Sequence, residues 1–406
     1  MKIVETVEYI VANQNLIHGV DLSRPRCGIS WWGFVGHIEP GELIRSMFNT
    51  LTLLCAILLS LCLPSCNAQH KTPFFVFGDS LYDNGMSLCC GVHAGGAKYW
   101  PYGENYFKEP SGRFSDGLII PDFIAQYAVV PLLKPYLSAG VKVDYTDGIN
   151  FASSTACVLN ENCPYAINLK VQLTYFNEAV ENLKQSLGES HTRRLLSKAV
   201  YLFNIGQYDY VTFFRNNIGM YPLSSSTKSQ YINLILGNLS THIKTIYEQG
   251  GRKFAFQNIG PIGCMPAIKY ELGFNEVCAD EPSELARLHN HAFAALANNL
   301  QIQLPGFNYS IYDFYTALYN RVLYGQTYGF KESETACCGG GAFNGDDSCQ
   351  KLDRAFSFCN NLKDHLWFDA WHLTQKAYHQ ISKEFWGGGL DVVAPYNLEN
   401  LFELIY

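Results

Sequence analysis

Three polar side chains, one near the start of the folded sequence and two near its end, could together carry out nucleophilic catalysis. Ser80 follows an apolar run over residues 74–77, while Asp369 and His372 lie three positions apart. A carboxylate at that spacing can accept the imidazole N–H, which orients the ring and stabilises its cationic form. An imidazole held in this way can take the proton of a serine hydroxyl that attacks a carbonyl carbon.

Each part of this set also has a structural explanation. Asp79 or Ser80 could cap a helix, and a histidine near an aspartate can simply be a hydrogen-bonded structural residue. Because Gly-Asp-Ser at the first strand and Asp-x-x-His near the C-terminus occur in one chain, we favour the catalytic interpretation.

The residues before Ser80 predict where its side chain lies. The apolar run predicts a short buried strand, and Gly78-Asp79-Ser80 predicts a tight turn from which a helix begins. Ser80 would then lie at the carboxyl edge of the sheet, where open α/β sheets bind ligands. Its N–H would lie near a helix N-terminus, where an oxyanion is favoured.

The composition limits the class of function. The 406 residues are 48% hydrophobic and 14% aromatic, which is enough apolar material for a sizeable core in one or two domains. Only 16% of the residues are charged, the formal net charge is -7, and Lys and Arg form no long run. Nucleic-acid-binding proteins carry a basic stripe, so we expect no nucleic-acid partner.

Residues 47–68 have the pattern of a secretory signal peptide. Met47 precedes an apolar run over 51–63 that is too short to span a bilayer comfortably, and small residues predict cleavage after Ala68. We interpret Met47 as the true start and residues 1–46 as a leader that comes from an over-extended gene model and is not part of the fold. The alternative is a membrane anchor preceded by a cytoplasmic leader. We therefore expect a secreted, extracellular protein without a stable membrane span.

The cysteines and sequons support export. Fourteen cysteines occur, and those after the signal segment are even in number, which predicts disulfides. None has zinc spacing, so we expect no metal. Two predicted disulfides would each close a short loop: Cys157–Cys163 and Cys264–Cys278. The four cysteines from Cys337 to Cys359 are predicted to form a local staple, whose pairing the spacing leaves open. The predicted glycosylation sites are Asn238 and Asn308.

Strands and helices are predicted to alternate along residues 69–406, which we treat as a single domain. The expected strands are 74–77, 148–152, 199–205, 253–258 and 309–313, and the expected helices are 119–128, 168–188, 227–249, 281–304, 314–324 and one, taken as the last, that starts near Thr374. This alternation predicts an α/β fold with a parallel sheet and helices on both faces. No strand is followed by Gly-x-Gly-x-x-Gly, which argues against a dinucleotide or flavin fold, and we expect no cofactor.

The motifs along the chain resemble those of the plant-type GDSL esterase/lipases of the SGNH hydrolase superfamily. The matching segments are residues 77–81, 112–117, 148–153, 258–264, 289–290 and 336–339, together with the Asp369/His372 pair. The resemblance implies a flavodoxin-like three-layer fold and the hydrolysis of acyl or acetyl esters. It assigns the nucleophile to Ser80, the orienting acid to Asp369 and the base to His372. Because no Gly-x-Ser-x-Gly elbow occurs, an α/β-hydrolase fold is a poorer match.

The sequence departs from the family pattern in the oxyanion hole. The family supplies the serine N–H, a glycine N–H after the second strand and an asparagine amide after the third. Here Cys157 replaces the glycine and Tyr208 replaces the asparagine. Cys157 still has a backbone N–H, which can donate to the oxyanion if the φ of Cys157 is negative. The side chain of Tyr208 has no amide, and losing one donor typically costs ~10²–10³ in turnover. Gln207 or Asn204 is an alternative donor, although a turn residue and a strand-end hydrogen-bonding residue are the simpler interpretations.

Two functions are compatible with these residues. The first is a secreted serine esterase/lipase whose activity is weakened by the altered oxyanion hole; the second is a catalytically impaired pseudoenzyme that binds a lipid or an acylated carbohydrate. We expect a monomer that takes a small-molecule ester or lipid substrate. Five aromatic residues could line the pocket, although a place in the core or wall is the simpler interpretation: Tyr82, Trp100, Tyr102, Trp367 and Trp371.

Overall fold

The structure is a computed structural model that describes residues 72–90, 95–138, 144–273, 277–346, 348–349 and 355–405. These residues belong to the compact unit His70–Tyr406. The proposed leader over 1–46 and signal peptide over 47–68 lie outside the described residues, so the division of the chain into leader, signal peptide and single domain stays a prediction. None of the helices in the described ranges is long and apolar enough to cross a membrane.

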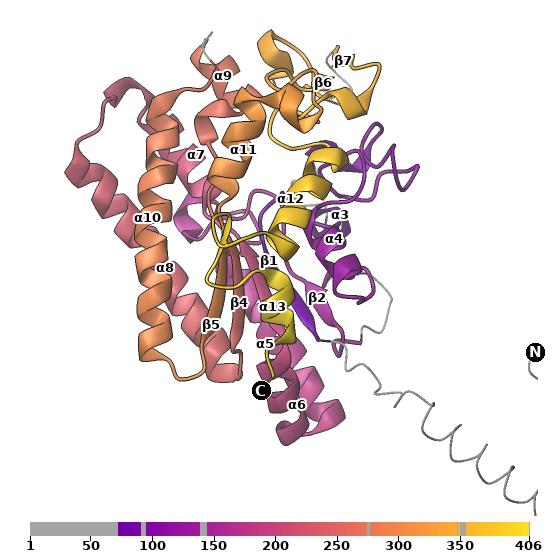
Figure 1. Cartoon of the computed structure of the whole chain (residues 1–406), viewed down its shortest axis with the longest axis vertical. Coiled ribbons are helices and arrows are strands. Elements are labelled where there is room, and N and C mark those ends of the chain that lie inside the picture. The colour runs from indigo at the N-terminus through magenta and orange to yellow at the C-terminus, as the bar shows by residue number, and fades with distance from the viewer. Residues whose placement is uncertain are drawn as a thin grey trace, which may run out of the picture. The chain divides into compact units, whose positions relative to one another are not determined.

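A mostly parallel sheet forms the centre of the unit (Figure 1). Its order is β2-β1-β3-β4-β5-β8, in which β8 pairs antiparallel with β5 and all other pairs are parallel. The first five positions follow the flavodoxin-like order, so the predicted fold class is confirmed, with β8 added at the edge. The strands are β1 (Phe74–Gly78), β2 (Gly148–Asn150), β3 (Val200–Asn204), β4 (Lys253–Gln257), β5 (Asn308–Tyr312) and β8 (Val393–Ala394), and a separate pair is β6 (Cys338–Gly339) with β7 (Ser357–Phe358).

Aromatic side chains cover one face of this sheet and connect its strands. The ring of Phe77 stacks on Phe203 at 4.9 Å between centroids, and Phe203 stacks on Phe256 at 5.4 Å. Phe176 of α5 (Leu169–Leu187) packs edge-on against Phe77 at 5.7 Å, and Phe293 of α10 (Asp280–Gln303) does the same to Phe256. Such contacts across neighbouring strands fix the register of the sheet.

The opposite face is covered by the C-terminal helices. Phe402 of α13 (Leu398–Glu403) packs against Phe74, and Phe385 of α12 (Gln375–Gly387) stacks on Tyr312 at 4.9 Å. Figure 1 shows α12 and α13 in yellow in front of the strands, with α8 and α10 on the other side. The sheet and the helices on its two faces form three layers. The packing of α13 on Phe74 brings the C-terminal segment of the chain next to β1, the first strand in the sequence.

Side-chain caps set the helix boundaries. The Asn168 side chain accepts from the Val171 N–H at the start of α5, and Thr374 caps α12. The remaining helices are α3 (Met86–Cys90), α4 (Ile120–Tyr127), α6 (Glu189–Lys198), α7 (Gln207–Asn216), α8 (Ser225–Gln249), α9 (Pro266–Leu272) and α11 (Phe314–Leu323). The six predicted helices are confirmed, although the helix after Thr374 is followed by α13 and is not the last. Helices α6, α7 and α9 were not predicted. In α6 only Thr192 and Leu196 are buried, so its apolar pattern is weak.

Four disulfides connect described cysteines: Cys157–Cys163, Cys264–Cys278, Cys337–Cys359 and Cys338–Cys349. The two predicted short loops are confirmed. The staple that the spacing left open is resolved into an outer bridge, Cys337–Cys359, and an inner bridge, Cys338–Cys349. The N–H groups of Cys337 and Cys338 donate to the carbonyl oxygens of Trp367 and Phe368, which joins this segment to the loop that carries Asp369.

Candidate active site

Ser80 lies just beyond the buried strand β1, in a turn at the carboxyl edge of the sheet. The strand ends at Gly78, where a Cβ would lie only 2.5 Å from the Asn204 carbonyl oxygen of β3, so a side chain is excluded. Ser80 itself is partly exposed.

The prediction that a helix begins at Ser80 is wrong. The Asp79 carboxylate accepts from the Leu81 N–H at 3.0 Å, which closes a local turn. The next helix is α3, and its start is fixed by Asp83, whose carboxylate accepts from the N–H groups of Gly85 and Met86. The N–H of Ser80 therefore belongs to a turn and not to a helix N-terminus.

Asp369 and His372 form a compact turn before α12. The Oδ1 atom of Asp369 accepts from the N–H groups of Trp371 at 2.8 Å and His372 at 2.7 Å. The Nδ1 atom of His372 lies 2.8 Å from both carboxylate oxygens. The backbone thus holds the carboxylate in place, and the carboxylate orients the ring, as the three-residue spacing predicted.

The structure brings Ser80 against this pair. The Nε2 atom of His372 lies 2.8 Å from Ser80 Oγ, across a sequence separation of 292 residues. A continuous line of hydrogen-bonding atoms therefore runs from Asp369 through the imidazole to the serine hydroxyl. Such a line can remove a proton from the hydroxyl as it attacks an electrophile.

Burial and hydrogen bonding act in opposite directions on Asp369. Burial raises the pKa of this carboxyl, but the His372 charge and the hydrogen bonds from His372 and Tyr102 outweigh it, so the pKa lies below its ordinary value. Asp369 is therefore ionised at neutral pH, as an acid that stabilises an imidazolium must be.

Asp79, the residue before the nucleophile candidate, behaves differently. It is 3% exposed, and burial raises its pKa to about 7 against the lowering effects of the Leu81 N–H and His372. A carboxyl group that changes its charge near neutral pH thus lies directly beside Ser80. This property could not be predicted from residue types and spacing, because burial is a property of the folded chain.

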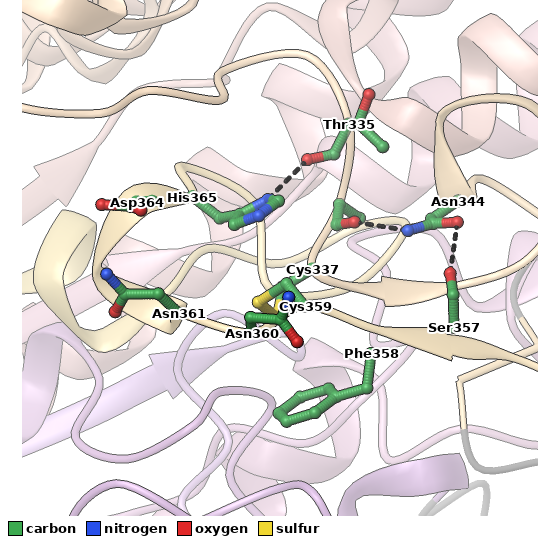
Figure 2. A pocket seen from close by; sticks show the side chains of 11 residues that line it. Thr335, Cys337, Asn344, Ser357, Phe358, Cys359, Asn360, Asn361, Asp364 and His365 are labelled. Atoms are coloured by element: carbon green, nitrogen blue, oxygen red, sulfur yellow. Dashed lines mark hydrogen bonds between the residues drawn. A yellow bond between two sulfur atoms is a disulfide. The ribbon is translucent and has the colours of Figure 1, made fainter.

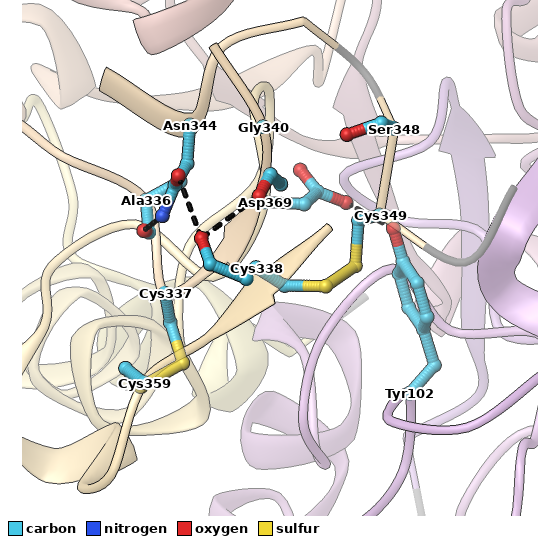
Figure 3. The surroundings of a disulfide bond; sticks show 12 residues. Tyr102, Ala336, Cys337, Cys338, Gly340, Asn344, Ser348, Cys349, Cys359 and Asp369 are labelled. Carbon is cyan, nitrogen blue, oxygen red and sulfur yellow. Dashed lines mark hydrogen bonds between the residues drawn. A yellow bond between two sulfur atoms is a disulfide. The ribbon is translucent and has the colours of Figure 1, made fainter. Parts of the chain in front are cut away.

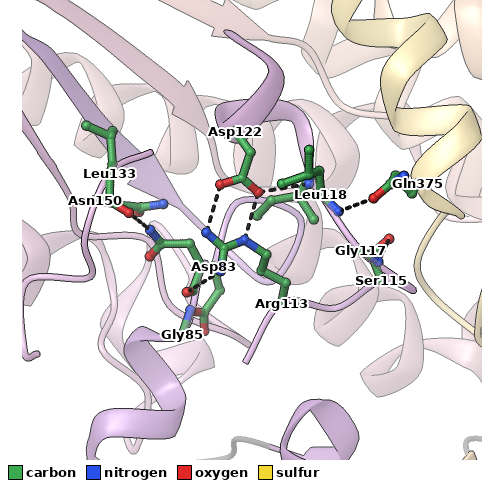
Figure 4. A network of polar contacts seen from close by, with 12 residues as sticks. Asp83, Gly85, Arg113, Ser115, Gly117, Leu118, Asp122, Leu133, Asn150 and Gln375 are labelled. Carbon is green, nitrogen blue, oxygen red and sulfur yellow. Dashed lines mark hydrogen bonds and ion pairs between the residues drawn. The ribbon is translucent and has the colours of Figure 1, made fainter. Parts of the chain in front are cut away.

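A residue of the segment 112–117 packs against the His372 imidazole, and a buried ion pair holds this segment in place. Arg113 makes a two-pronged contact with Asp122, at 2.7 and 2.8 Å, and donates to the Asn84 carbonyl oxygen (Figure 4). The next residue, Phe114, packs against the His372 ring with 4.7 Å between centroids. This segment was recognised from its motif alone, and the buried ion pair gives it a physical role.

The two predicted oxyanion-hole positions lie on segments joined to each other. The Asp209 carboxylate accepts from the Val158 and Leu159 N–H groups at 2.8 and 3.0 Å, and from Asn162 Nδ2 at 2.8 Å. Burial raises the pKa of Asp209 to about 6 despite these bonds. The first turn of α7 thereby holds the loop that begins at Cys157.

Cys157 meets the condition under which its N–H can donate. It is not among the described residues with positive φ, whereas Thr155, two positions earlier, has a φ of 58°. Its side chain is bonded to Cys163, which closes the loop held by Asp209. In the described part of the chain, neither the Cys157 N–H nor the Ser80 N–H donates to a protein acceptor.

Tyr208 is partly exposed in the first turn of α7, and no hydrogen bond of its phenol is seen among the described residues. Of the alternative donors, Gln207 Oε1 accepts from the Gly260 N–H at 3.3 Å, which occupies its side chain in a structural contact. Asn204 is 1% exposed, and neither its Nδ2 nor its Oδ1 has a partner in the described structure.

The other candidate residues divide between core and surface. Tyr82 and Trp367 are core residues that donate to Gln257 and to the Ser333 carbonyl oxygen. Trp100 is 53% exposed, and Trp371 is partly buried. Of the sequons, Asn238 is exposed on α8, and Asn308 is partly buried at the start of β5.

A cavity of about 380 Å³ lies beside the disulfide Cys337–Cys359, with His365, Asn361 and Phe358 in its wall (Figure 2). None of the catalytic candidates lines it, and His365 Nδ1 there lies 3.3 Å from the Thr335 carbonyl oxygen. In the described ranges no cluster of His, Cys, Asp and Glu could hold a metal ion.

Comparisons with known proteins extend over most of the chain. Residues 74–385 match a family described as GDSL-like lipase/acylhydrolase. A protein named GDSL lipase from Tanacetum cinerariifolium is 42% identical over 357 residues, which cover 87% of this chain and 94% of the relative. GDSL esterase/lipase 4 of Arabidopsis thaliana is 38% identical over 378 residues, with 88% and 99% covered.

A further relative has a name that indicates lost activity. The inactive GDSL esterase/lipase-like protein 25 of Arabidopsis thaliana is 36% identical over 331 residues, which cover 81% of this chain and 74% of the relative.

Proposed function

This chain belongs to the GDSL-like lipase/acylhydrolase family and is an ester-bond hydrolase, and from that premise we propose that it acts through a Ser80–His372–Asp369 triad. The observation that supports the triad is the line of contacts at 2.8 Å from Asp369 to His372 and from His372 to Ser80. No cofactor takes part in this proposal.

The reaction follows from these contacts. Ser80 Oγ attacks the ester carbonyl carbon while His372 Nε2 takes the hydroxyl proton, and Asp369 stabilises the imidazolium that forms. The tetrahedral intermediate collapses when His372 returns the proton to the leaving alcohol, which leaves an acyl group on Ser80. A water molecule, activated by His372 in the same way, then releases the acid and restores the hydroxyl.

The oxyanion would be held by backbone donors. The N–H groups of Ser80 and Cys157 have no protein acceptor among the described residues, so both are available to a developing negative charge. Tyr208 supplies no amide, and we propose that turnover is therefore reduced.

A second candidate follows from Tyr208 and from the relative whose name marks it as inactive. In this version turnover is so low that the site serves mainly to bind a lipid or an acylated carbohydrate. The two candidates differ in whether removal of the Ser80 hydroxyl changes the rate of ester hydrolysis.

We propose that the protein is secreted, glycosylated and monomeric. Four disulfides among the described residues support an oxidising compartment. N-terminal sequencing of secreted protein is expected to begin near Gln69, and recovery of intact residues 1–46 would contradict the proposed leader.

The test of the triad is hydrolysis of a short-chain p-nitrophenyl ester by secreted protein and by Ser80→Ala. We expect the variant to lose at least about 10⁴-fold in kcat, since the members of a triad act as a unit. Ser225→Ala, which removes an exposed hydroxyl from α8, is the matched control and is expected to keep the wild-type rate. Equal rates for wild type and Ser80→Ala would rule out the triad.

A further inference from the structure

The phenol of Tyr102 contacts the proposed catalytic acid. Tyr102 is 4% exposed, and its Oη donates to Asp369 Oδ2 at 2.5 Å across 267 residues of sequence. We propose that Tyr102 is a positioning residue that fixes the Asp369 carboxylate relative to His372. This inference rests on the proposed function and adds a further residue to the same site.

The two carboxylate oxygens are held unequally, which gives Tyr102 its importance. The backbone N–H groups of Trp371 and His372 both donate to Oδ1. Oδ2 receives the Tyr102 hydroxyl and shares the imidazole N–H with Oδ1. Without the phenol, Oδ2 keeps only this shared donor, so the carboxylate gains freedom to rotate away from the imidazole.

A small apolar cluster fixes the phenol in turn. It is separate from the main core and consists of Ala97, Tyr102, Phe114, Cys338, Cys349 and Phe368. The Tyr102 ring packs edge-on against Phe368 at 4.8 Å and against Phe114 at 6.1 Å. Because Phe368 precedes Asp369 and Phe114 contacts His372, one ring touches both supports of the catalytic pair.

The disulfide Cys338–Cys349 is part of this cluster, and Figure 3 shows it together with Tyr102 and Asp369. The Cys338 N–H also donates to the Phe368 carbonyl oxygen at 2.8 Å, which joins β6 to the loop carrying Asp369. The cystine therefore anchors the wall against which Tyr102 packs, and it does so from a third part of the chain.

The burial of Tyr102 indicates a positioning role and argues against a role in lining a substrate pocket. A side chain with 4% exposure whose hydroxyl donates to a buried carboxylate has little surface left for a substrate. Trp100, two positions earlier, is 53% exposed and packs against Phe358, so these two aromatic residues of one loop lie in different surroundings.

Tyr102→Phe tests the inference, because it keeps the ring and removes the donor. We expect kcat for a p-nitrophenyl ester to fall about tenfold with KM unchanged, in the range of one hydrogen bond to a charged group. The low-pH limb of the kcat/KM profile is expected to move to higher pH, because a carboxylate without the phenol attracts the imidazolium proton more strongly.

Other ionisable groups near the pair are unchanged in the variant. The His372 charge lowers the pKa of Asp79, the residue after β1, and the charges of Asp369 and Asp79 raise the pKa of Tyr378 in α12. A shift of the limb in Tyr102→Phe therefore reports the lost phenol. A variant with merely weakened packing would lose thermal stability without moving the limb.

Tyr106→Phe is the matched control, since it removes a phenol that is 48% exposed from the same loop. A second readout does not depend on ester hydrolysis: the His372 imidazole is titrated by NMR in wild type, Tyr102→Phe and Tyr106→Phe, with its signal assigned by its loss in His372→Gln. The midpoint is expected to rise only in Tyr102→Phe. An unchanged rate, limb and midpoint in Tyr102→Phe, or equal changes in Tyr106→Phe, would overturn the inference. Failure of the proposed function would show separately, as a wild-type rate in Ser80→Ala.

Discussion

Replacing Asp79 by asparagine is expected to stabilise the protein increasingly as the pH rises. Asp79 is 3% exposed, and burial raises its pKa from 3.8 to about 7. Asparagine keeps the shape of the side chain and an oxygen that can accept from the Leu81 N–H, but it cannot ionise. The variant therefore removes only the consequences of the buried charge.

The sign follows from proton binding in the two states. At a pH between the unfolded pKa of 3.8 and the folded pKa of about 7, Asp79 holds a proton in the folded protein and releases it on unfolding. The stability contributed by this proton is fully present below the lower value and is lost as the pH rises through the higher one. One pKa unit corresponds to about 1.4 kcal/mol, so the advantage of Asp79→Asn grows by about 3 kcal/mol between about pH 5 and about pH 8.5.

The measurement is urea unfolding of wild type and Asp79→Asn at these two pH values. A change in the free energy of unfolding that comes from the packing of the new amide is the same at both pH values, so it cancels when they are compared. The titration of Asp209 cancels as well where the variant leaves it unchanged. Asp391→Asn removes the same charge from an exposed position and is the matched control. The reasoning is refuted if the difference between Asp79→Asn and wild type is the same at both pH values.

Three further predictions concern the loops and the surface. Tyr208→Asn is expected to raise kcat for a p-nitrophenyl ester, by up to ~10² if the new amide reaches the oxyanion; an unchanged or lower kcat would show that Tyr208 is not the defect. Cys157→Gly combined with Cys163→Ser is expected to lower the free energy of unfolding by ~2 kcal/mol, since it opens a short loop; equal urea midpoints with and without the bridge would contradict this. Asn238→Gln and Asn308→Gln are each expected to reduce the mass of the secreted protein by one glycan; a mass unchanged beyond the substitution itself would exclude that site.

Local patterns were sufficient for most elements. Strands such as β1 are short apolar runs that end at glycine, and α5 has both an apolar face and an asparagine cap. The turn after β1 was wrongly predicted to begin a helix. Whether a helix or a turn forms at Ser80 depends on which backbone N–H groups donate hydrogen bonds to the Asp79 and Asp83 carboxylates. Helix α13 was missed, and its place follows from the packing of Phe402 on Phe74.

The sequence by itself determined the parallel α/β fold, the family and the pairing of Asp369 with His372, because these depend on periodicity, ordered motifs and a spacing within one turn. Only the tertiary structure decided that Ser80 Oγ lies 2.8 Å from His372 Nε2, that Tyr102 donates to Asp369, and that burial brings the pKa of Asp79 to about 7. Each of these depends on sheet register and on side-chain packing between segments far apart in the chain, and residue spacing carries no information about either.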